Sequence, residues 1–344
     1  MDKSYILNFA EKILSIDSPS GYTHNIINYL EEICKSNNYA YEKNRKGNLI
    51  ITIPGKTNYT IGLSAHVDTL GAMVRSIKGD GTLSFTTIGG PILPTYDGEY
   101  CKVYTRDGKV YTGTFLSDAP AIHVFESARS LTRDEKNMHI RLDEIVKSKS
   151  DTEKLGISSG DFIAIDPKTI ITENGFIKSR FLDDKISVAI LFGLLNHLKV
   201  NNIILDSTLK VIISTYEEVG HGASSIPDVD ELIAVDMGCI GLDLNCTEYD
   251  VSICAKDGSG PYDYEITTQL TCMAKQEKIN YAVDIYPYYS SDVSAALRGG
   301  NNIRGALIGP GVSASHGMER THTNAVLATL SLLIAYLKSA KKAA

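Results

Sequence analysis

The sequence has little of what marks membrane-spanning, secreted or nucleic-acid-binding proteins. Its longest dense apolar run, residues 186–195, contains Ser187 and Gly193 and reaches about half the length of a membrane span. Residues 1–10 lack the cationic start and the apolar stretch of a signal peptide. The 34 Lys and Arg against 41 Asp and Glu give a net charge of −7, which argues against the dense basic face of a nucleic-acid binder.

Cysteine is also scarce, and the remaining composition is that of an ordinary globular protein. Six cysteines in 344 residues, without C-x-x-C spacing, are too few for a disulfide scaffold. We therefore expect reduced thiols in a cytoplasmic protein that binds neither membrane nor nucleic acid. Apolar residues make up 43% and charged residues 22% of the chain, as is typical of folded domains. The length suffices for one large core and an accessory module.

Apolar periodicity divides most of the chain into two stretches of alternating helices and strands. The first stretch predicts two helices and then two strands, over residues 4–18, 24–37, 48–54 and 60–65. The second stretch predicts a helix, two strands and a closing helix, over residues 183–198, 209–214, 232–235 and about 324–340. This alternation is typical of a layered α/β domain.

The chain between these stretches differs in character. Residues 72–123 alternate in short segments with Asp-Gly pairs at Asp80, Asp97 and Asp107, which favour hairpin turns and predict an antiparallel β module. Residues 124–155 are charged and are predicted to be helical, and a hairpin over 163–178 leads back. The expected organisation is a discontinuous α/β domain with an inserted β-rich domain, over residues 1–71 and 165–344 and over 72–164 respectively.

Side chains that handle metals or protons follow three of the predicted strands. The strand over 60–65 is followed by His66, the strand over 209–214 by Glu217 and Glu218, and the strand over 232–235 by Asp236. In open α/β sheets, ligands bind beyond the carboxyl ends of the strands. The sequence therefore predicts a site at one edge of the sheet.

The spacing of these residues suggests separate tasks. His66 and Asp68 point to the same side of an extended chain, so Asp68 can accept a hydrogen bond from the second ring nitrogen of His66 and fix its metal-binding tautomer. Glu217 and Glu218 diverge, so one can bind a metal while the other acts as general base on a water molecule. The alternatives are an ordinary loop pair and two solvated surface acids.

Further candidates lie at the starts of two predicted helices. Asp183 and Asp184 could be N-caps or partners of the helix dipole, a role that suits Asp184 better, whereas Asp183 could bridge two cations. The polar loop before the last helix offers His316 and His322 as one more ligand. Four histidines without acidic neighbours are expected in packing or at the surface: His24, His123, His139 and His197.

Five motifs occur in a fixed order along the chain. They are Ala65-His-Val-Asp-Thr-Leu-Gly71, Phe181-Leu-Asp-Asp-Lys185, Thr215-Tyr-Glu-Glu-Val-Gly220, Val235-Asp236 and Arg320-Thr-His-Thr323. With these motifs the chain resembles the M42 metallo-aminopeptidases, the group of the tetrahedral aminopeptidases. The resemblance implies an α/β fold of the dinuclear zinc exopeptidase type, in which helices sandwich a mixed sheet and the inserted β-rich domain serves as lid and oligomerisation surface.

The resemblance also implies two divalent cations per chain. Histidine and carboxylate ligands suit Zn²⁺ or Co²⁺, with Mn²⁺ as a third candidate. Carried over to this sequence, the ligand sets are His66, Asp183 and Asp236 for one cation and Asp183, Glu218 and His322 for the other. Glu217 would be the general base, and Asp68 would orient His66.

The sequence departs from the usual family pattern in three places. Lys185 stands where the family usually has Arg, and the inserted region over 72–160 is divergent. The loop around His316 is also unlike the common context, so His316 competes with His322 for the role of ligand.

The implied reaction is removal of the N-terminal residue from short peptides. A water molecule bridged by the cations would attack the carbonyl, and Glu217 would take its proton and pass it to the leaving amine. The implied partners are short peptides and copies of the same chain, as dimers that assemble into a tetrahedral dodecamer. Ser291, Asp292 and Gly260 are expected to contribute to the substrate pocket.

Two other interpretations compete with this one. Residues 156–160 match G-x-S-x-G around Ser158, the pattern of a serine hydrolase, but a polar segment precedes them instead of the apolar strand that a nucleophile elbow requires. The chain could also be a binding protein or a non-peptidase hydrolase on the same scaffold. Retention of the presumed ligands and of Glu217 argues against a loss of catalysis.

Overall fold

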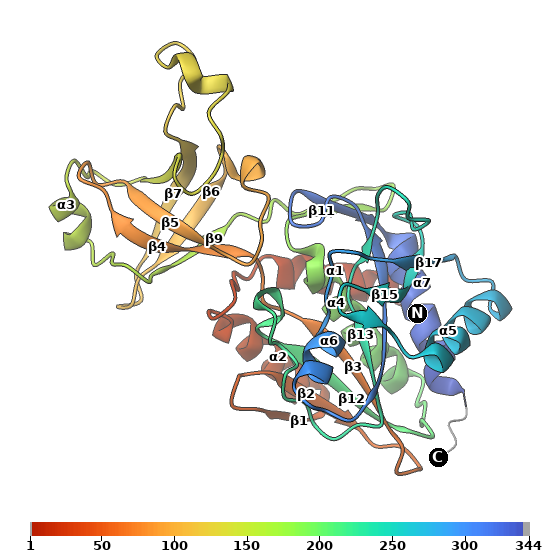
Figure 1. Cartoon of the computed structure of the whole chain (residues 1–344). Helices are drawn as coiled ribbons and strands as arrows, with labels where there is room; N and C mark the ends of the chain where they lie inside the picture. The colour runs from red at the N-terminus through yellow and green to blue at the C-terminus, as the bar shows by residue number, and fades with distance from the viewer. Residues whose placement is uncertain (1, 340–344) are drawn as a thin grey trace.

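A large mixed sheet forms the centre of the molecule in the computed structural model, which describes residues 2–339 (Figure 1). In spatial order its strands are β1 (Ala40–Lys43), β2 (Leu49–Ile53), β12 (Thr208–Ser214), β3 (Thr60–His66), β13 (Glu231–Val235), β18 (Arg304–Val312), β15 (Val251–Asp257) and β16 (Gly260–Pro261). Two strands lie off this path: β17 (Tyr281–Ile285) pairs with β15, and β14 (Gly238–Cys239) pairs with β18.

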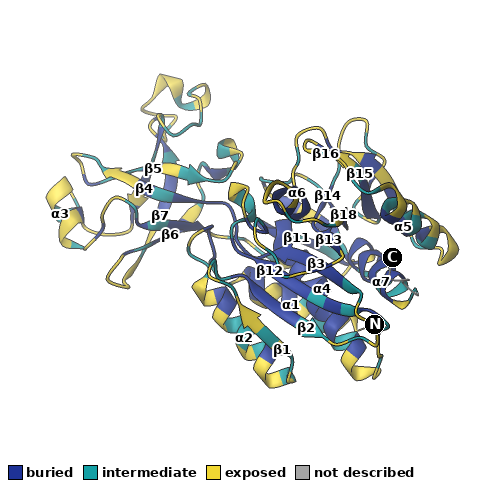
Figure 2. Cartoon of the chain, turned by 60° about the horizontal axis from the view of Figure 1, so that its bottom comes forward, coloured by how far each residue is buried: buried dark blue, intermediate teal, exposed yellow. Residues whose placement is uncertain are grey.

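Both faces of the sheet are buried at its central strands, because these strands carry apolar side chains at consecutive positions. In β2, Leu49 and Ile51 belong to one core cluster, while Ile50 between them belongs to another on the opposite face. The first core is shared with buried side chains of α1 (Lys3–Leu14), α2 (His24–Asn37), α4 (Leu182–Val200), α5 (Tyr264–Gln276) and α7 (Thr323–Lys338). The second is covered by α6 (Asp292–Arg298). Figure 2 shows the central strands of the sheet and α4 mostly in the colour of buried residues.

The direction of the central strands decides where functional side chains can gather. β12 and β13 both pair in parallel with β3, and β18 pairs in parallel with β13. The carboxyl ends of these four strands therefore lie at the same edge of the sheet. The residues that follow them are brought together whatever their separation along the chain.

A closed barrel is inserted in the chain between β3 and β12, which are themselves neighbours in the sheet. Its strands in order are β4 (Gly71–Ile77), β5 (Leu83–Ile88), β8 (Met138–Leu142), β7 (Val110–Ser117), β6 (Tyr100–Tyr104) and β9 (Phe162–Ile165). Phe85, Phe115 and Val103 are fully buried in it. Figure 1 shows the barrel beside the main body, with η2 (Glu126–Arg129) on an arm that projects from it. We propose residues 72–164 as the extent of the inserted domain.

The expected fold class is confirmed, whereas some local assignments in the barrel are wrong. Residues 124–155 are not mainly helical: besides η2 and the short α3 (Lys149–Lys154), they include β8, where Met138, Ile140 and Leu142 alternate inward. Asp97-Gly98 follows η1 (Leu93–Tyr96) and is not a hairpin turn.

The remaining expectations concern the end of the chain and the thiols. The last helix ends at Lys338, and residue 340 of the expected helix lies outside the described residues. All six cysteines are free. Within residues 2–339, no helix combines the length and the apolar composition needed to cross a membrane.

Candidate metal centre

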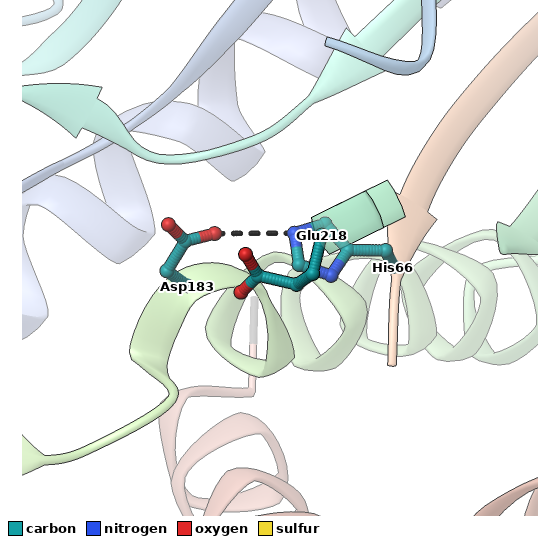
Figure 3. Close-up of side chains that lie close together, drawn as sticks. All are labelled: His66, Asp183 and Glu218. Atoms are coloured by element: carbon teal, nitrogen blue, oxygen red, sulfur yellow. Dashed lines mark hydrogen bonds and ion pairs between the residues drawn. The ribbon is translucent and has the colours of Figure 1, made fainter. Parts of the chain in front are cut away.

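A cluster of buried histidine and acidic side chains lies at the carboxyl edge of the central strands. His66 ends β3, Asp236 follows β13, and Glu217 and Glu218 lie in η3 (Glu217–Val219) shortly after β12. Asp183 joins them from the start of α4, and Figure 3 shows its carboxylate facing His66 and Glu218. The Nε2 atom of His66 lies 3.1 Å from Oδ1 of Asp183 and 3.7 Å from Oε2 of Glu217.

Two overlapping groups within this cluster have the spacing of metal ligands. Ligand atoms of His66, Asp183 and Glu218 all lie within 4.8 Å of one another, and so do those of His66, Asp184 and Asp236. Asp184 is therefore a member of the cluster and not the N-cap or helix-dipole partner that its position suggested. It is fully buried, its backbone is not helical, and its Oδ2 accepts the backbone N–H of His66 at 3.2 Å.

Asp68 supports the cluster differently from the expected way. The Nδ1 atom of His66 lies 2.9 Å from the backbone carbonyl of Asp68 and 3.6 Å from its carboxylate. Because a carbonyl only accepts, Nδ1 carries the hydrogen and Nε2 is left to bind a metal. The carboxylate instead accepts the backbone N–H groups of Glu217 and Glu218 and the hydroxyl of Ser20. Asp68 thus fixes both His66 and the glutamate pair.

His316 occupies the position that was expected for His322. Its Nε2 atom lies 3.6 Å from Oδ2 of Asp183 and 3.6 Å from Oε2 of Glu218. Its Nδ1 atom lies 2.9 Å from the carbonyl oxygen of Gly90 and so must donate to it. His316 therefore has the same arrangement as His66, with one nitrogen held by a backbone carbonyl and the other facing carboxylates.

His322 is not part of the cluster, and the expectation that it binds a metal needs correction. Its Nε2 donates to the carbonyl of Asn174 at 2.8 Å, and its Nδ1 accepts the backbone N–H of Asn324 as the N-cap of α7. Both ring nitrogens are engaged, so no lone pair is left for a cation. The ring packs edge-on against Phe176, with 5.0 Å between ring centroids.

Glu319 is a supporting residue that the sequence patterns did not reveal. It is buried, and its two carboxylate oxygens accept the backbone N–H groups of Asp183 and of His316, each at 3.0 Å. One side chain therefore ties together two candidate ligands that lie 133 positions apart in the sequence. A signal that could have found it is its place three residues after His316 in the same polar loop.

The cluster brings several carboxylates together in a buried place, and this changes their pKa values. Burial raises the pKa values of Glu217, Glu218 and Asp236, the last to about 7. Burial alone would lower the pKa of His316, but Asp183 and Glu218 raise it to about 10. The Oε1 atom of Glu218 is buried and has no hydrogen-bond partner in the described part of the chain.

These observations fit the binding of divalent cations. An imidazole lone pair that faces a carboxylate is unfavourable unless a proton or a cation lies between them. The structure repeats this arrangement at both His66 and His316. Buried carboxylate oxygens without donors, as in Glu218 and Asp184, provide further ligand atoms.

Removal of cations should make the folding stability depend on pH in a defined direction. Raised pKa values mean that the cation-free folded state binds more protons than the unfolded chain, so its stability falls as pH rises from about 4.5 to 8. Asp236 at about 7 and Glu319 at about 8 contribute to this window. Above pH 7 the buried Lys185 acts in the opposite direction, because burial lowers its pKa to about 7.

Thermal unfolding with and without Zn²⁺ at pH 5 and pH 7 tests this expectation. Cations replace the bound protons, so the rise in Tm on adding Zn²⁺ should be larger at pH 7. At one hundred times the Kd, each cation adds about 2.7 kcal/mol to the free energy of unfolding. Equal shifts at both pH values would contradict the placement of cations among these groups.

The residues expected to bind substrate fall into two classes. Ser291 and Asp292 are 1% and 2% exposed, so they do not line an open pocket. Ser291 caps α6, while Asp292 accepts from Ser214 Oγ and from the backbone N–H of Ala223, which supports the loop carrying Glu217. Gly260 is half-buried in β16, and its contribution to a substrate pocket stays a prediction.

A glycine is required where this loop closes over Asp292. A Cβ atom on Gly222 would lie 2.6 Å from Oδ1 of Asp292 and 2.9 Å from the backbone nitrogen of Glu217. Such contacts are too short for any other residue, so the tight path of the loop depends on Gly222.

Ser158 lies outside the cluster, as do the four histidines that were expected in packing or at the surface. Ser158 precedes β9 of the barrel, and its backbone N–H bonds to Asp161. The histidines have local roles: His24 contacts Tyr22, His139 bonds to Asp118, His197 lies beside Asn201, and His123 is exposed.

Comparison with known proteins finds aminopeptidases in each case. The model of the M42 glutamyl aminopeptidase family matches residues 47–332. A putative aminopeptidase of Bacillus subtilis, YhfE, is 47% identical over 336 residues, which cover 97% of each chain. An aminopeptidase structure from Desulfurococcus kamchatkensis superposes with a TM-score of 0.87 at 22% identity, covering 98% of this chain and 96% of that chain.

A second solved structure shares the same fold. The TET1 peptidase of Pyrococcus horikoshii, described as able to assemble into a tetrahedron or a large octahedral shell, superposes with a TM-score of 0.84 at 20% identity. The match covers 97% of this chain and 100% of that chain.

Proposed function

This chain belongs to the M42 family of aminopeptidases, and from that premise we propose that it removes the N-terminal residue of short peptides at a centre of two divalent cations. The family membership makes it a peptidase and therefore a hydrolase. The observation that carries the proposal is the repeated arrangement of His66 and His316. In each, a backbone carbonyl holds Nδ1 and the free Nε2 faces Asp183.

Asp183 is the proposed bridge between the two cations. Its Oδ1 faces His66 at 3.1 Å and its Oδ2 faces His316 at 3.6 Å, so each oxygen serves one side. The proposed ligand sets are His66, Asp183 and Asp236 on one side and Asp183, Glu218 and His316 on the other. Asp184 lies beside the first set. This donor set suits Zn²⁺ or Co²⁺, with Mn²⁺ as a third candidate.

Glu217 is the proposed general base. When bound, the cations supply polarisation of the scissile carbonyl and a water molecule of lowered pKa. The carboxylate of Glu217 would take a proton from the attacking water and pass it to the leaving amine. Its position suits this task because Asp68 fixes its backbone and its carboxylate lies beside His66, only 14% exposed.

We further propose that the protein works as a homo-oligomer, with the barrel as lid and assembly surface. The barrel arm carries apolar side chains that are exposed in the single chain, among them Ile122, Val124 and Phe125. Exposed apolar groups on a projecting arm are typical of a contact surface. The TET1 neighbour described above assembles into closed shells, and a tetrahedral dodecamer of dimers is the corresponding proposal for this chain.

A panel of aminoacyl-nitroanilides, assayed across Zn²⁺, Co²⁺ and Mn²⁺, tests the proposed activity. We expect hydrolysis that a chelator abolishes and added cation restores. The N-acetylated form of the best substrate is the matched control and should resist cleavage, because the reaction requires a free α-amine. Activity that survives the chelator and disappears with a serine-directed reagent would contradict the proposal and favour Ser158.

A further inference from the structure

We propose that the inserted barrel completes the metal centre, because a latch formed by Arg180 and barrel residues 89–96 holds His316 in its ligating position. This inference rests on the proposed two-cation function. It goes beyond the role of the barrel as a lid, since it makes one of the two cation positions depend on contacts between the barrel and the main domain.

The barrel holds His316 by two hydrogen bonds, one to its ring and one to its backbone carbonyl. Residues 89–96 connect β5 to β6 of the barrel, whereas His316 lies in the loop between β18 and β19 (Glu319–His322) of the main domain. Gly90 accepts from Nδ1 of His316 at 2.9 Å, and the backbone N–H of Ile92 donates to the carbonyl of His316 at 3.1 Å. The same barrel segment therefore fixes both the ring and the backbone of this ligand.

Arg180 links that segment to the loop of His316 by hydrogen bonds. It is 2% exposed, and its Nη1 donates to the hydroxyl of Thr95 and to the carbonyl of Gly317, each at 3.2 Å. Its Nη2 donates to the carbonyl of Thr95 at 2.6 Å, and the guanidinium lies 5.0 Å from the ring centre of Tyr96. Only a planar, forked cation can reach both segments at once, so Lys would not replace Arg here.

The two cation positions differ in their dependence on the barrel. The carbonyl that orients His66 belongs to Asp68, two residues away in the same domain. The carbonyl that orients His316 belongs to Gly90, 226 positions away in the barrel. Loss of a group that orients a ligand typically costs 10- to 100-fold in metal affinity. Weakening the latch should therefore lower the affinity for the cation at Asp183, Glu218 and His316 and leave the affinity of the other position unchanged.

Titration of cation-free protein with Co²⁺, followed by calorimetry and visible absorption, tests this asymmetry. We expect two binding events in the unmodified protein. In Arg180→Met the affinity of the first event, which we assign to the position at His66, should stay within about twofold. The affinity of the second event, at His316, should fall by about 10- to 100-fold. Peptidase activity should recover at saturating Co²⁺. Arg180→Lys and Thr95→Val should weaken the second event by less, and they carry the test if Arg180→Met does not fold.

Arg133→Met is the matched control. The guanidinium of Arg133 also joins parts of the barrel, through Asp97 and the carbonyls of Leu131 and Ala128, but it makes none of the latch contacts. Its two binding events should match those of the unmodified protein. The latch is refuted if Arg180→Met binds both cations normally or weakens both equally. An unmodified protein that binds no cation would instead refute the proposed function.

Discussion

Replacement of Glu217 by Gln should lower kcat by about 10²- to 10⁴-fold while both cations remain bound. The amide has the shape of the carboxylate but cannot accept the proton of the attacking water. Its backbone N–H would still donate to Asp68, so the loop should keep its path. The measurements are kcat and KM on the best nitroanilide substrate, together with the cation content after dialysis.

Glu218→Gln is the matched comparison for this experiment. The two glutamates are adjacent and both lie half-buried in the cluster, but only Glu218 faces His316. We expect Glu218→Gln to bind its second cation more weakly and to regain activity at high cation concentration, which Glu217→Gln should not do. A Glu217→Gln variant that retains more than about one tenth of kcat would remove Glu217 from the role of base.

Substitution of the two histidines before the last helix should have opposite consequences. His316→Ala removes a candidate ligand, so the protein should retain one cation in place of two and lose at least about 100-fold in kcat/KM at limiting metal. His322→Ala should retain both cations and its activity. It should instead lower the free energy of unfolding by about 1 kcal/mol, because it removes the N-cap of α7.

The two variants serve as controls for each other, since both histidines lie in the same short region. Elemental analysis after dialysis gives the cation content, and thermal unfolding gives the change in stability. The assignment of His316 is wrong if His322→Ala loses a cation while His316→Ala keeps both.

The positions of His66, Glu217, Glu218 and Asp236 could be predicted because they depend on local patterns. Apolar runs identified β3, β12 and β13, and parallel pairing places the ends of these strands at one edge. The start of α4 was equally clear from its apolar pattern, so Asp183 was identified with it. Each of these side chains is carried to the site by the regular element next to it in the sequence.

Other assignments failed because they depend on contacts across long sequence separations. His316 and His322 stand in the same polar stretch of the sequence and have the same chemistry, so no local pattern distinguishes them. The structure distinguishes them by hydrogen bonds: Asn174 and Asn324 engage both nitrogens of His322, while Gly90 engages only one nitrogen of His316. The buried roles of Asp184 and Asp292 were hidden for the same reason.

The sequence by itself therefore determined the α/β class, the order of the elements and most of the acidic cluster, because alternation of apolar residues is a local property. Only the tertiary structure decided which histidine keeps a free lone pair, how Asp68 and Glu319 support their neighbours, and that the barrel contacts the centre. A lone pair becomes available or engaged through the partners that folding brings to it, and here those partners come from distant parts of the chain.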